Sequence, residues 1–158
     1  MIIAVTGHRD IVVDHVLQDK IDTFFHEMFQ MHESVTLLSP LAEGADQLVA
    51  EIFLKYENRI LDVPMPFDQE TYLKALNATS RQNFLTLVKE AEHIFEVPKV
   101  CAHPYQSLGH YLIDNSDVLL ALWDGTNNGR QGGTADVVSF AKSKNNTIIH
   151  FLCERQNN

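Results

Sequence analysis

The stretch IAVTGHRD, residues 3–10, places a short apolar run directly before a glycine, a histidine and an arginine. An apolar strand that ends at a flexible turn is the usual start of a unit in which a helix follows a strand. Gly7 lets the main chain approach a ligand, Thr6 offers a hydroxyl group, and the Arg9 guanidinium can bind a phosphate through two hydrogen bonds. The stretch therefore predicts the first strand of an α/β fold and one wall of an anion site.

Strand-like and helical patterns alternate along the rest of the chain, and several strands are apolar throughout, as in a sheet covered on both faces. The strand-like runs cover residues 2–6, 34–39, 59–65, 93–98, 117–123 and 146–152. The helical patterns cover residues 12–31, 45–56, 69–76, 105–115 and 134–143, with a further helix beginning after Thr79 or Ser80 as its N-cap. In the first helix, Val13 and Val16 are expected on the apolar face.

This alternation predicts a single domain over residues 1–153, with residues 154–158 as a frayed tail. The expected fold is a Rossmann-like three-layer α/β/α sandwich around a mostly parallel, doubly wound sheet of five to seven strands. In such a sheet, ligands bind beyond the carboxyl ends of the strands, where the strand order reverses. The turns that follow the strands are therefore the places to look for a site.

Composition narrows the function classes. The chain has 158 residues and a formal net charge of −9, which argues against general nucleic-acid binding but not against binding a small nucleotide. Cys101 and Cys153 lack metal-ligand spacing, and free thiols fit a reducing compartment. The eight histidines form no helical ligand pair, so neither a metal site nor a cofactor is expected. No signal peptide or apolar run of membrane-spanning length occurs, so we expect a cytoplasmic protein without membrane contact.

A cluster of apolar residues in the first helix leaves a homodimer open as one alternative. The cluster is more apolar than one buried helix face requires. It consists of Phe24, Phe25, Met28, Phe29 and Met31.

Two further turns are rich in groups that suit an anion. In LSPLAEGADQLVAE, residues 38–51, Ser39 ends a strand, and Gly44 and Ala45 begin a helix whose free N–H groups favour a negative charge. Glu43 and Asp46 in the same turn fit helix caps better than catalytic groups.

The third turn, WDGTNNGRQGGTADVV at residues 123–138, holds four glycines before a helix that begins at Thr134. So many glycines raise the conformational entropy lost on folding, a cost that is explained if the main chain must come close to a ligand. Asp124 could accept a ribose hydroxyl or cap the turn, and Arg130 could reach a phosphate or point to water. The spacing matches neither a P-loop nor G-x-G-x-x-G, which disfavours a kinase or an ordinary dehydrogenase.

The segments IAVTGHR, SPLAEGADQLVAE and DVLLALWDG…GGTADVVSFAK resemble the signature segments of the SLOG superfamily of Rossmann-like nucleotide-binding domains. This superfamily includes the Smf/DprA DNA-processing proteins and the LOG phosphoribohydrolases. LSPLAEGAD is similar to the Smf/DprA segment SGLARGID, with Pro40 replacing its first glycine, and GGTADVV is similar to the LOG segment PGGxGTxxE. The resemblance covers roughly residues 1–145 and is closest to small bacterial members with a WDG…GGTADVV ending.

The resemblance implies a nucleotide-type ligand whose phosphates or ribose lie against the three turns. Together, the turns and the resemblance predict a set of ligand-binding residues. The set is Thr6, Gly7, His8, Arg9, Ser39, Glu43, Gly44, Ala45, Asp124, Gly125, Gly132, Gly133 and Thr134.

The chain departs from the LOG enzymes at their catalytic residues. Where they carry a glutamate three residues after the motif threonine, this chain has Val137, and the helix before the fifth strand has no arginine, with His110 the nearest polar residue. Asp136 is one residue early, which turns a side chain by about 100° around a helix. Standard LOG hydrolysis is therefore not expected.

Three functions follow from the sequence as alternatives. The favoured one is a binding or sensor module for a nucleoside monophosphate or an ADP-ribose-type ligand. The second is a nucleoside or nucleotide N-glycosidase or transferase that uses Asp136, Glu43 or Asp46 as its carboxylate, each a weak candidate. The third is single-stranded DNA binding, which the acidic composition opposes.

Overall fold

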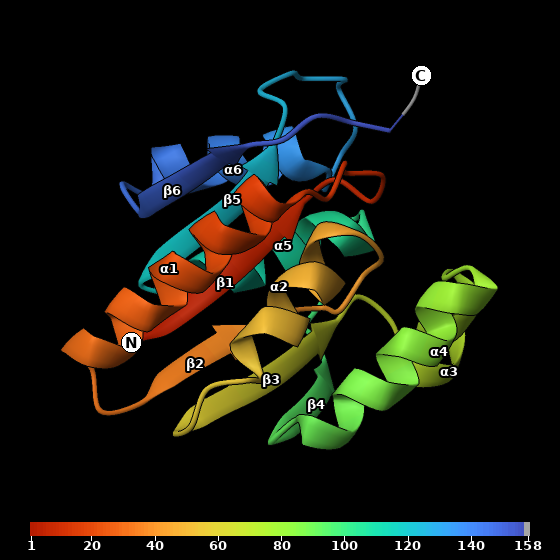
Figure 1. Ribbon diagram of the computed structural model, residues 1–158. Coiled ribbons are helices and arrows are strands. Elements are labelled where there is room, and N and C mark those ends of the chain that lie inside the picture. The colour runs from red at the N-terminus through yellow and green to blue at the C-terminus, as the bar shows by residue number, and fades with distance from the viewer. Residues whose placement is uncertain (157–158) are drawn as a thin grey trace.

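The computed structural model describes residues 1–156, which form a Rossmann-like α/β sandwich around one six-stranded sheet (Figure 1). All strands are parallel, in the order β4-β3-β2-β1-β5-β6, which confirms the predicted fold class. The strands are β1 (Ile2–Gly7), β2 (Val35–Leu38), β3 (Arg59–Met65), β4 (His93–Glu96), β5 (Val118–Trp123) and β6 (Thr147–Leu152).

Helices cover both faces of the sheet, and the face to which each strand connects determines where a ligand crevice forms. The helices are α1 (His15–Met31), α2 (Ala45–Phe53), α3 (Gln69–Lys74), α4 (Ala78–Leu87), the 3₁₀-helix η1 (Val88–Glu90), α5 (Pro104–Asp114) and α6 (Thr134–Ser143). In Figure 1, α1, α2 and α4 lie on the near face and α5 and α6 lie behind, each set over its own hydrophobic core cluster. The chain leaves β1 for the near face and β5 for the far face, so a crevice opens between the carboxyl ends of these neighbouring strands.

Two helices begin at different residues from those predicted. The Asn77 side chain accepts a hydrogen bond from the Ser80 N–H at 2.8 Å, so Asn77 is the N-cap of α4, in place of Thr79 or Ser80. Asp14 caps α1 in the same way, at 2.8 Å from the Leu17 N–H.

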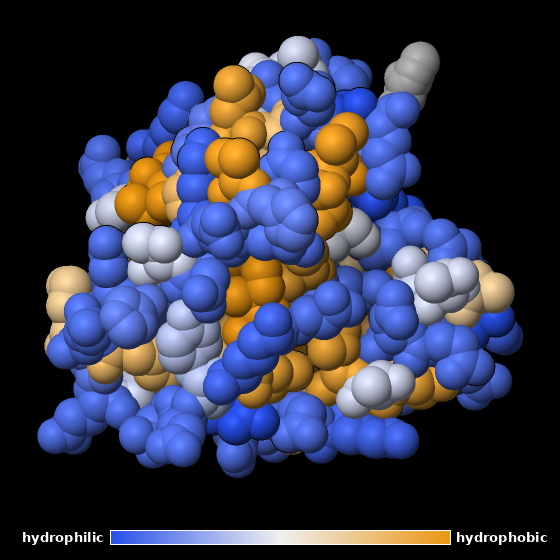
Figure 2. Space-filling model, viewed as in Figure 1, coloured by the Kyte–Doolittle hydropathy of each residue, from blue (hydrophilic) through white to orange (hydrophobic). Residues whose placement is uncertain are grey.

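The later start of α1 changes its buried face. Leu17, Ile21, Phe24 and Phe25 form the buried stripe. Val13 precedes the helix and Val16 lies beside the stripe, so both are exposed, at 45% and 63%, and their predicted place in the core is wrong. Apolar side chains accordingly appear on the surface around α1 in Figure 2.

The end of the chain is ordered as far as it is described, which corrects the prediction of a tail that frays from residue 154. Residues 154–156 pair with the loop after β1 through the antiparallel bridge between Ile11 and Arg155. The Val12 N–H donates to the Glu154 oxygen at 2.8 Å, and the Gln156 N–H donates to the Asp10 oxygen at 2.7 Å. The loop and the C-terminal segment thus satisfy each other's main-chain hydrogen-bonding groups. Residues 157–158 lie outside the described residues.

No helix within residues 1–156 is both long enough and apolar enough to cross a membrane.

Candidate ligand site

A cavity of about 750 Å³ lies in the crevice between β1 and β5. All three turns that the sequence singles out contribute to its wall: residues 6–10 at the end of β1 and just after it, Pro40, Ala42 and Asp46 after β2, and residues 128–135 after β5. The volume falls within the range of small-molecule sites, about 300–1,000 Å³. The fold therefore gathers three segments that are distant in sequence around one hollow.

The turn after β1 is fixed by close packing. A Cβ atom on Gly7 would lie 2.3 Å from the Ala45 Cβ and 2.7 Å from the Leu122 oxygen, so only glycine fits there. The His8 N–H extends the strand by donating to that Leu122 oxygen at 3.2 Å. The Arg9 side chain, 42% exposed, lies 3.7 Å from the Glu43 carboxylate. Thr6, Gly7, His8 and Arg9 all line the cavity, as a binding role requires.

Three residues of the second turn are not among the described residues that line the cavity, and two of them, Gly44 and Ala45, pack against the first turn. The Ala45 N–H donates to the His8 oxygen at 3.1 Å, so this amide is not free for an anion. Gly44 has φ +80° and lies so close that a Cβ atom would be 2.3 Å from the Arg9 oxygen. Ser39 is fully buried and accepts a hydrogen bond from the Leu41 N–H at 3.2 Å.

The two acidic residues of this turn have different surroundings. The Glu43 carboxylate accepts hydrogen bonds from the Asn77 amide and, at 3.4 Å, from the Ser80 hydroxyl, and it lines a second hollow of about 540 Å³. Asp46 lines the main cavity, although only 7% of it is exposed. Burial raises the pKa of Asp46 to about 7, against smaller lowering effects of the Ala42 N–H bond and Arg9. Near neutral pH, Asp46 can therefore donate or accept a proton.

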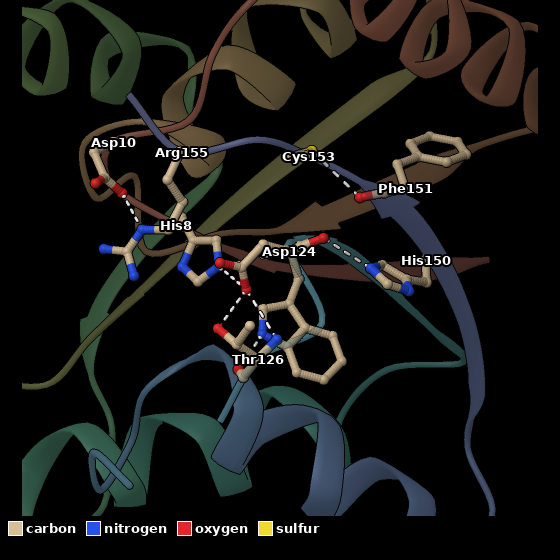
Figure 3. A network of polar contacts seen from close by, with 9 residues as sticks. His8, Asp10, Asp124, Thr126, His150, Phe151, Cys153 and Arg155 are labelled. Atoms are coloured by element: carbon tan, nitrogen blue, oxygen red, sulfur yellow. Dashed lines mark hydrogen bonds and ion pairs between the residues drawn. The ribbon is translucent and has the colours of Figure 1, made fainter. Parts of the chain in front are cut away.

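Asp124 anchors the long glycine loop and does not itself line the cavity within residues 1–156 (Figure 3). Its Oδ1 atom accepts hydrogen bonds from the Thr126 N–H at 2.9 Å and the Thr126 hydroxyl at 2.7 Å. These bonds, followed by the neighbouring His8 ring 3.1 Å away, lower the pKa of Asp124 to about 2. The Oδ1 atom is thus engaged by Thr126 and His8, and Gly125 next to Asp124 is also absent from the described cavity wall.

The end of the glycine loop brings the N-terminus of helix α6 to the cavity. Gly132, Gly133 and Thr134 line the cavity, and Thr134 opens helix α6. Gly132 has φ +73°, and a Cβ atom there would lie 2.6 Å from the Tyr105 Cβ, so the loop rests directly on α5. The N–H groups of Thr134 and Ala135 donate to no acceptor among residues 1–156, and both residues line the cavity. A helix N-terminus with free amides favours an anion.

Asp136 turns away from the position that catalysis would need. Its Oδ2 atom accepts a hydrogen bond from the Gly132 N–H at 2.8 Å, and within the described chain it is not part of the cavity wall. Val137, the residue at the position of the LOG glutamate, does line the cavity. His110 stacks on the Phe140 ring with centroids 3.8 Å apart and is likewise outside the described wall.

Several cavity residues lie outside the set of ligand-binding residues that the sequence predicts. His103 and Tyr105 come from the start of α5, Tyr72 from α3, and Arg155 from the C-terminal segment. The turn after β4 reaches the same edge as the other turns because β4 is parallel to them, so the predicted fold itself pointed to His103 and Tyr105. No feature of the sequence indicates that Arg155 lines the cavity, because the pairing between residues 11 and 155 has no local sequence pattern.

No group of three or more His, Cys, Asp or Glu side chains within residues 1–156 is arranged to hold a metal ion. Cys101 and Cys153 are free thiols, and burial raises the pKa of Cys153 to about 11.

Comparison with known proteins identifies the fold alone. No family model matches the chain, and no curated protein matches it. Among solved structures, the chain is similar to the X-ray structure of TM1055, a target of the Northeast Structural Genomics Consortium, with a TM-score of 0.57 and 14% sequence identity. The match covers 93% of this chain and 71% of TM1055, so the whole Rossmann-like core is shared.

Proposed function

We propose that the chain binds a nucleotide-type ligand, a nucleoside monophosphate or an ADP-ribose-type molecule, and acts as a binding or sensor module. The observation that carries this proposal is one cavity that joins the free amides of the α6 N-terminus to the side chains of Arg9 and Arg130. In a chain with a net charge of −9, such a basic cavity favours an anion at this point of the surface.

The apolar residues of the cavity wall suit a base or another planar apolar group. Val5, Leu108, Leu112 and Val137 line the cavity together with the Tyr105 ring. A ligand with an apolar ring and an anionic end would match both the apolar and the basic residues of the wall. The resemblance to the SLOG superfamily supports the same ligand class, because its three signature segments border this cavity. An apolar residue at the position of the LOG glutamate favours binding over hydrolysis.

A thermal-shift screen of the full chain against nucleoside mono- and diphosphates, NAD and ADP-ribose tests the proposal. A ligand at 100 times its Kd adds about 2.7 kcal/mol to the stability of the folded state, which corresponds to a rise in Tm of about 5–10 °C for a domain of this size. Calorimetry then measures the affinity of each hit. Unchanged melting with every compound at millimolar concentration would reject the proposal.

A second candidate function is hydrolysis of an N-glycosidic bond, and Asp46 is the observation that favours it. Glu43 and Asp136, the other carboxylates considered, are not part of the cavity wall within residues 1–156, whereas the Asp46 carboxyl lines the cavity with a pKa of about 7. A protonated carboxyl can give its proton to the leaving base while water adds to the sugar carbon.

Chromatography for free base after incubation with AMP, NAD or deoxynucleosides tests this alternative. Hydrolysis by Asp46 requires that wild type releases base and that Asp46→Asn, which keeps the size of the side chain, does not. Absence of base from a preparation that binds the same compounds would leave the binding module as the function.

A further inference from the structure

The arginines of this chain are concentrated at the cavity. Three of its five arginines, Arg9, Arg130 and Arg155, line the cavity, and none of its seven lysines does within the described residues. Each comes from a different segment: the turn after β1, the glycine loop and the C-terminal segment. A planar guanidinium matches phosphate oxygens better than an ammonium group does. The distribution therefore favours a ligand with phosphate groups over a weakly charged one.

Arg155 is held in the wall by main-chain contacts that do not depend on its own side chain. The segment around it pairs with the loop that directly follows Arg9, through the Ile11–Arg155 bridge and the bonds of Glu154 and Gln156. The Gln156 amide also donates to the Ile11 oxygen at 2.9 Å, and Ile11 is 1% exposed. The backbone hydrogen bonds on either side of Arg155 thus hold this residue at the cavity.

The Arg155 guanidinium has donors left over. Its Nε–H donates to the Asp10 Oδ1 atom at 2.9 Å, which orients the group (Figure 3). Its terminal NH₂ groups donate to no acceptor among residues 1–156, and the side chain is 37% exposed. A guanidinium has five N–H donors, so four remain for a ligand.

One phosphate has enough partners without Arg155. The free amides of Thr134 and Ala135 and the side chains of Arg9 and Arg130 line the same cavity, and they supply more donors than the oxygens of a single phosphate need. Arg155, anchored by a different carboxylate from the one beside Arg9, is an additional cation in the same cavity.

We infer that the ligand carries a second anionic group and that Arg155 binds it, so that the site takes diphosphate- or bisphosphate-containing compounds in preference to monophosphates. This inference rests on the proposed function, since it concerns the same cavity. It makes Arg155 a ligand-binding residue, with Asp10 as the positioning residue that orients its guanidinium.

Calorimetry on the full chain with two pairs of probes tests the inference: inorganic phosphate against pyrophosphate, and AMP against ADP. Wild type is expected to bind the second member of each pair more tightly. Arg155→Gln is expected to weaken binding of pyrophosphate and ADP by about 10- to 100-fold, the worth of charge-assisted hydrogen bonds, and binding of phosphate and AMP by less than about twofold. Arg155→Lys is expected to recover part of the loss, because it keeps the charge without the planar fork.

Arg59→Gln is the matched control, because it makes the same change in net charge. Arg59 pairs with Glu90 at 3.2 Å and is not part of the described cavity wall, so affinity for all four probes is expected to stay unchanged. Thermal melting of each variant verifies folding. Equal effects of Arg155→Gln on mono- and diphosphates, or no effect on either, would overturn the inference while the proposed function stands. If the wild-type protein binds none of the probes or nucleotides, both the inference and the proposed function are rejected.

Discussion

Arg9 lies on an exposed turn and, among residues 1–156, makes one loose ion pair, so its contribution to folding is small and its contribution to binding can be measured separately. We expect Arg9→Ala to weaken nucleotide binding by about 1.5–3 kcal/mol, the worth of a charge-assisted hydrogen bond, while the free energy of unfolding stays nearly constant. Arg9→Lys is expected to recover part of the affinity. Calorimetry with a confirmed ligand gives the first quantity, and urea unfolding gives the second.

Glu43→Gln is the control for that experiment. Glu43 lines the second hollow, contacts Asn77 and Ser80, and pairs only loosely with Arg9 at 3.7 Å, so Glu43→Gln is expected to leave ligand affinity largely intact. Equal affinities of wild type and Arg9→Ala for the ligand would show that Arg9 is a solvent-exposed residue that does not bind the ligand.

Asp46 makes stability depend on pH in a direction that its burial determines. Its pKa is 3.8 for an unperturbed group and about 7 in the folded state. Below about pH 4 the carboxyl is protonated in both states and contributes nothing; between about pH 4 and 7 only the unfolded state releases the proton, so stability falls as pH rises. We expect Asp46→Asn to raise the free energy of unfolding by about 1–4 kcal/mol at about pH 8 and to change it little near pH 4.

Urea unfolding of wild type and Asp46→Asn at both pH values measures this difference. A variant that is less stable than wild type at about pH 8 would show that the ionised carboxylate is stabilised in the folded protein and that its pKa is not raised.

Which turn residues meet the cavity could be predicted only in part from the residue types. Gly7 and Arg9 were singled out as a cavity wall and do line it, whereas Gly44 and Ala45 matched the same family pattern and instead support the turn from behind. A glycine that brings a ligand close and a glycine that brings a neighbouring main chain close look alike in a sequence. Only the register of α2 against β1 distinguishes them.

At the scale of elements, the contact between β1 and α2 predicts unequal costs for two glycine substitutions. Gly7→Ala puts a methyl group 2.3 Å from the Ala45 Cβ, so strand and helix must separate, and we expect a loss of about 2–4 kcal/mol. Gly125→Ala meets no atom within 4 Å, and only its φ of +86° is unfavourable, which costs about 1 kcal/mol. Urea unfolding compares the two variants, and equal losses would contradict the close packing.

The sequence patterns predicted the strands more accurately than the ends of helices. The continuous apolar run at residues 118–123 marks a parallel strand inside the sheet because both faces are buried, and β5 begins within one residue of the predicted strand 117–123 and ends with it. Helix starts depend on which of several adjacent polar residues caps the first turn, as Asn77 does for α4. The ordered segment 154–156 depends on a partner more than 140 positions away in the chain, which no local pattern encodes.

At the scale of the whole molecule, the apolar cluster of residues 24–31 is mostly used inside the chain. Phe24 and Phe25 are buried, and the Phe29 ring stacks on Tyr56 with centroids 4.9 Å apart. Met31 remains exposed at 67%. The cluster therefore joins α1 to α2, and a homodimer through this helix stays a prediction whose support is now one exposed side chain and the apolar surface around α1.

The distribution of charge over the whole molecule separates nucleotide binding from single-stranded DNA binding. A DNA strand needs a basic groove that neutralises several phosphates, whereas this chain has a net charge of −9 and gathers three arginines in one cavity of about 750 Å³. We expect a gel-shift assay at about 150 mM salt, near physiological ionic strength, to show no complex with single-stranded DNA, and DNA to leave the binding of a confirmed nucleotide ligand unchanged in competition. A complex whose affinity falls steeply with added salt would instead show that several phosphates are bound along the surface, and the cavity would then be one end of a longer DNA site.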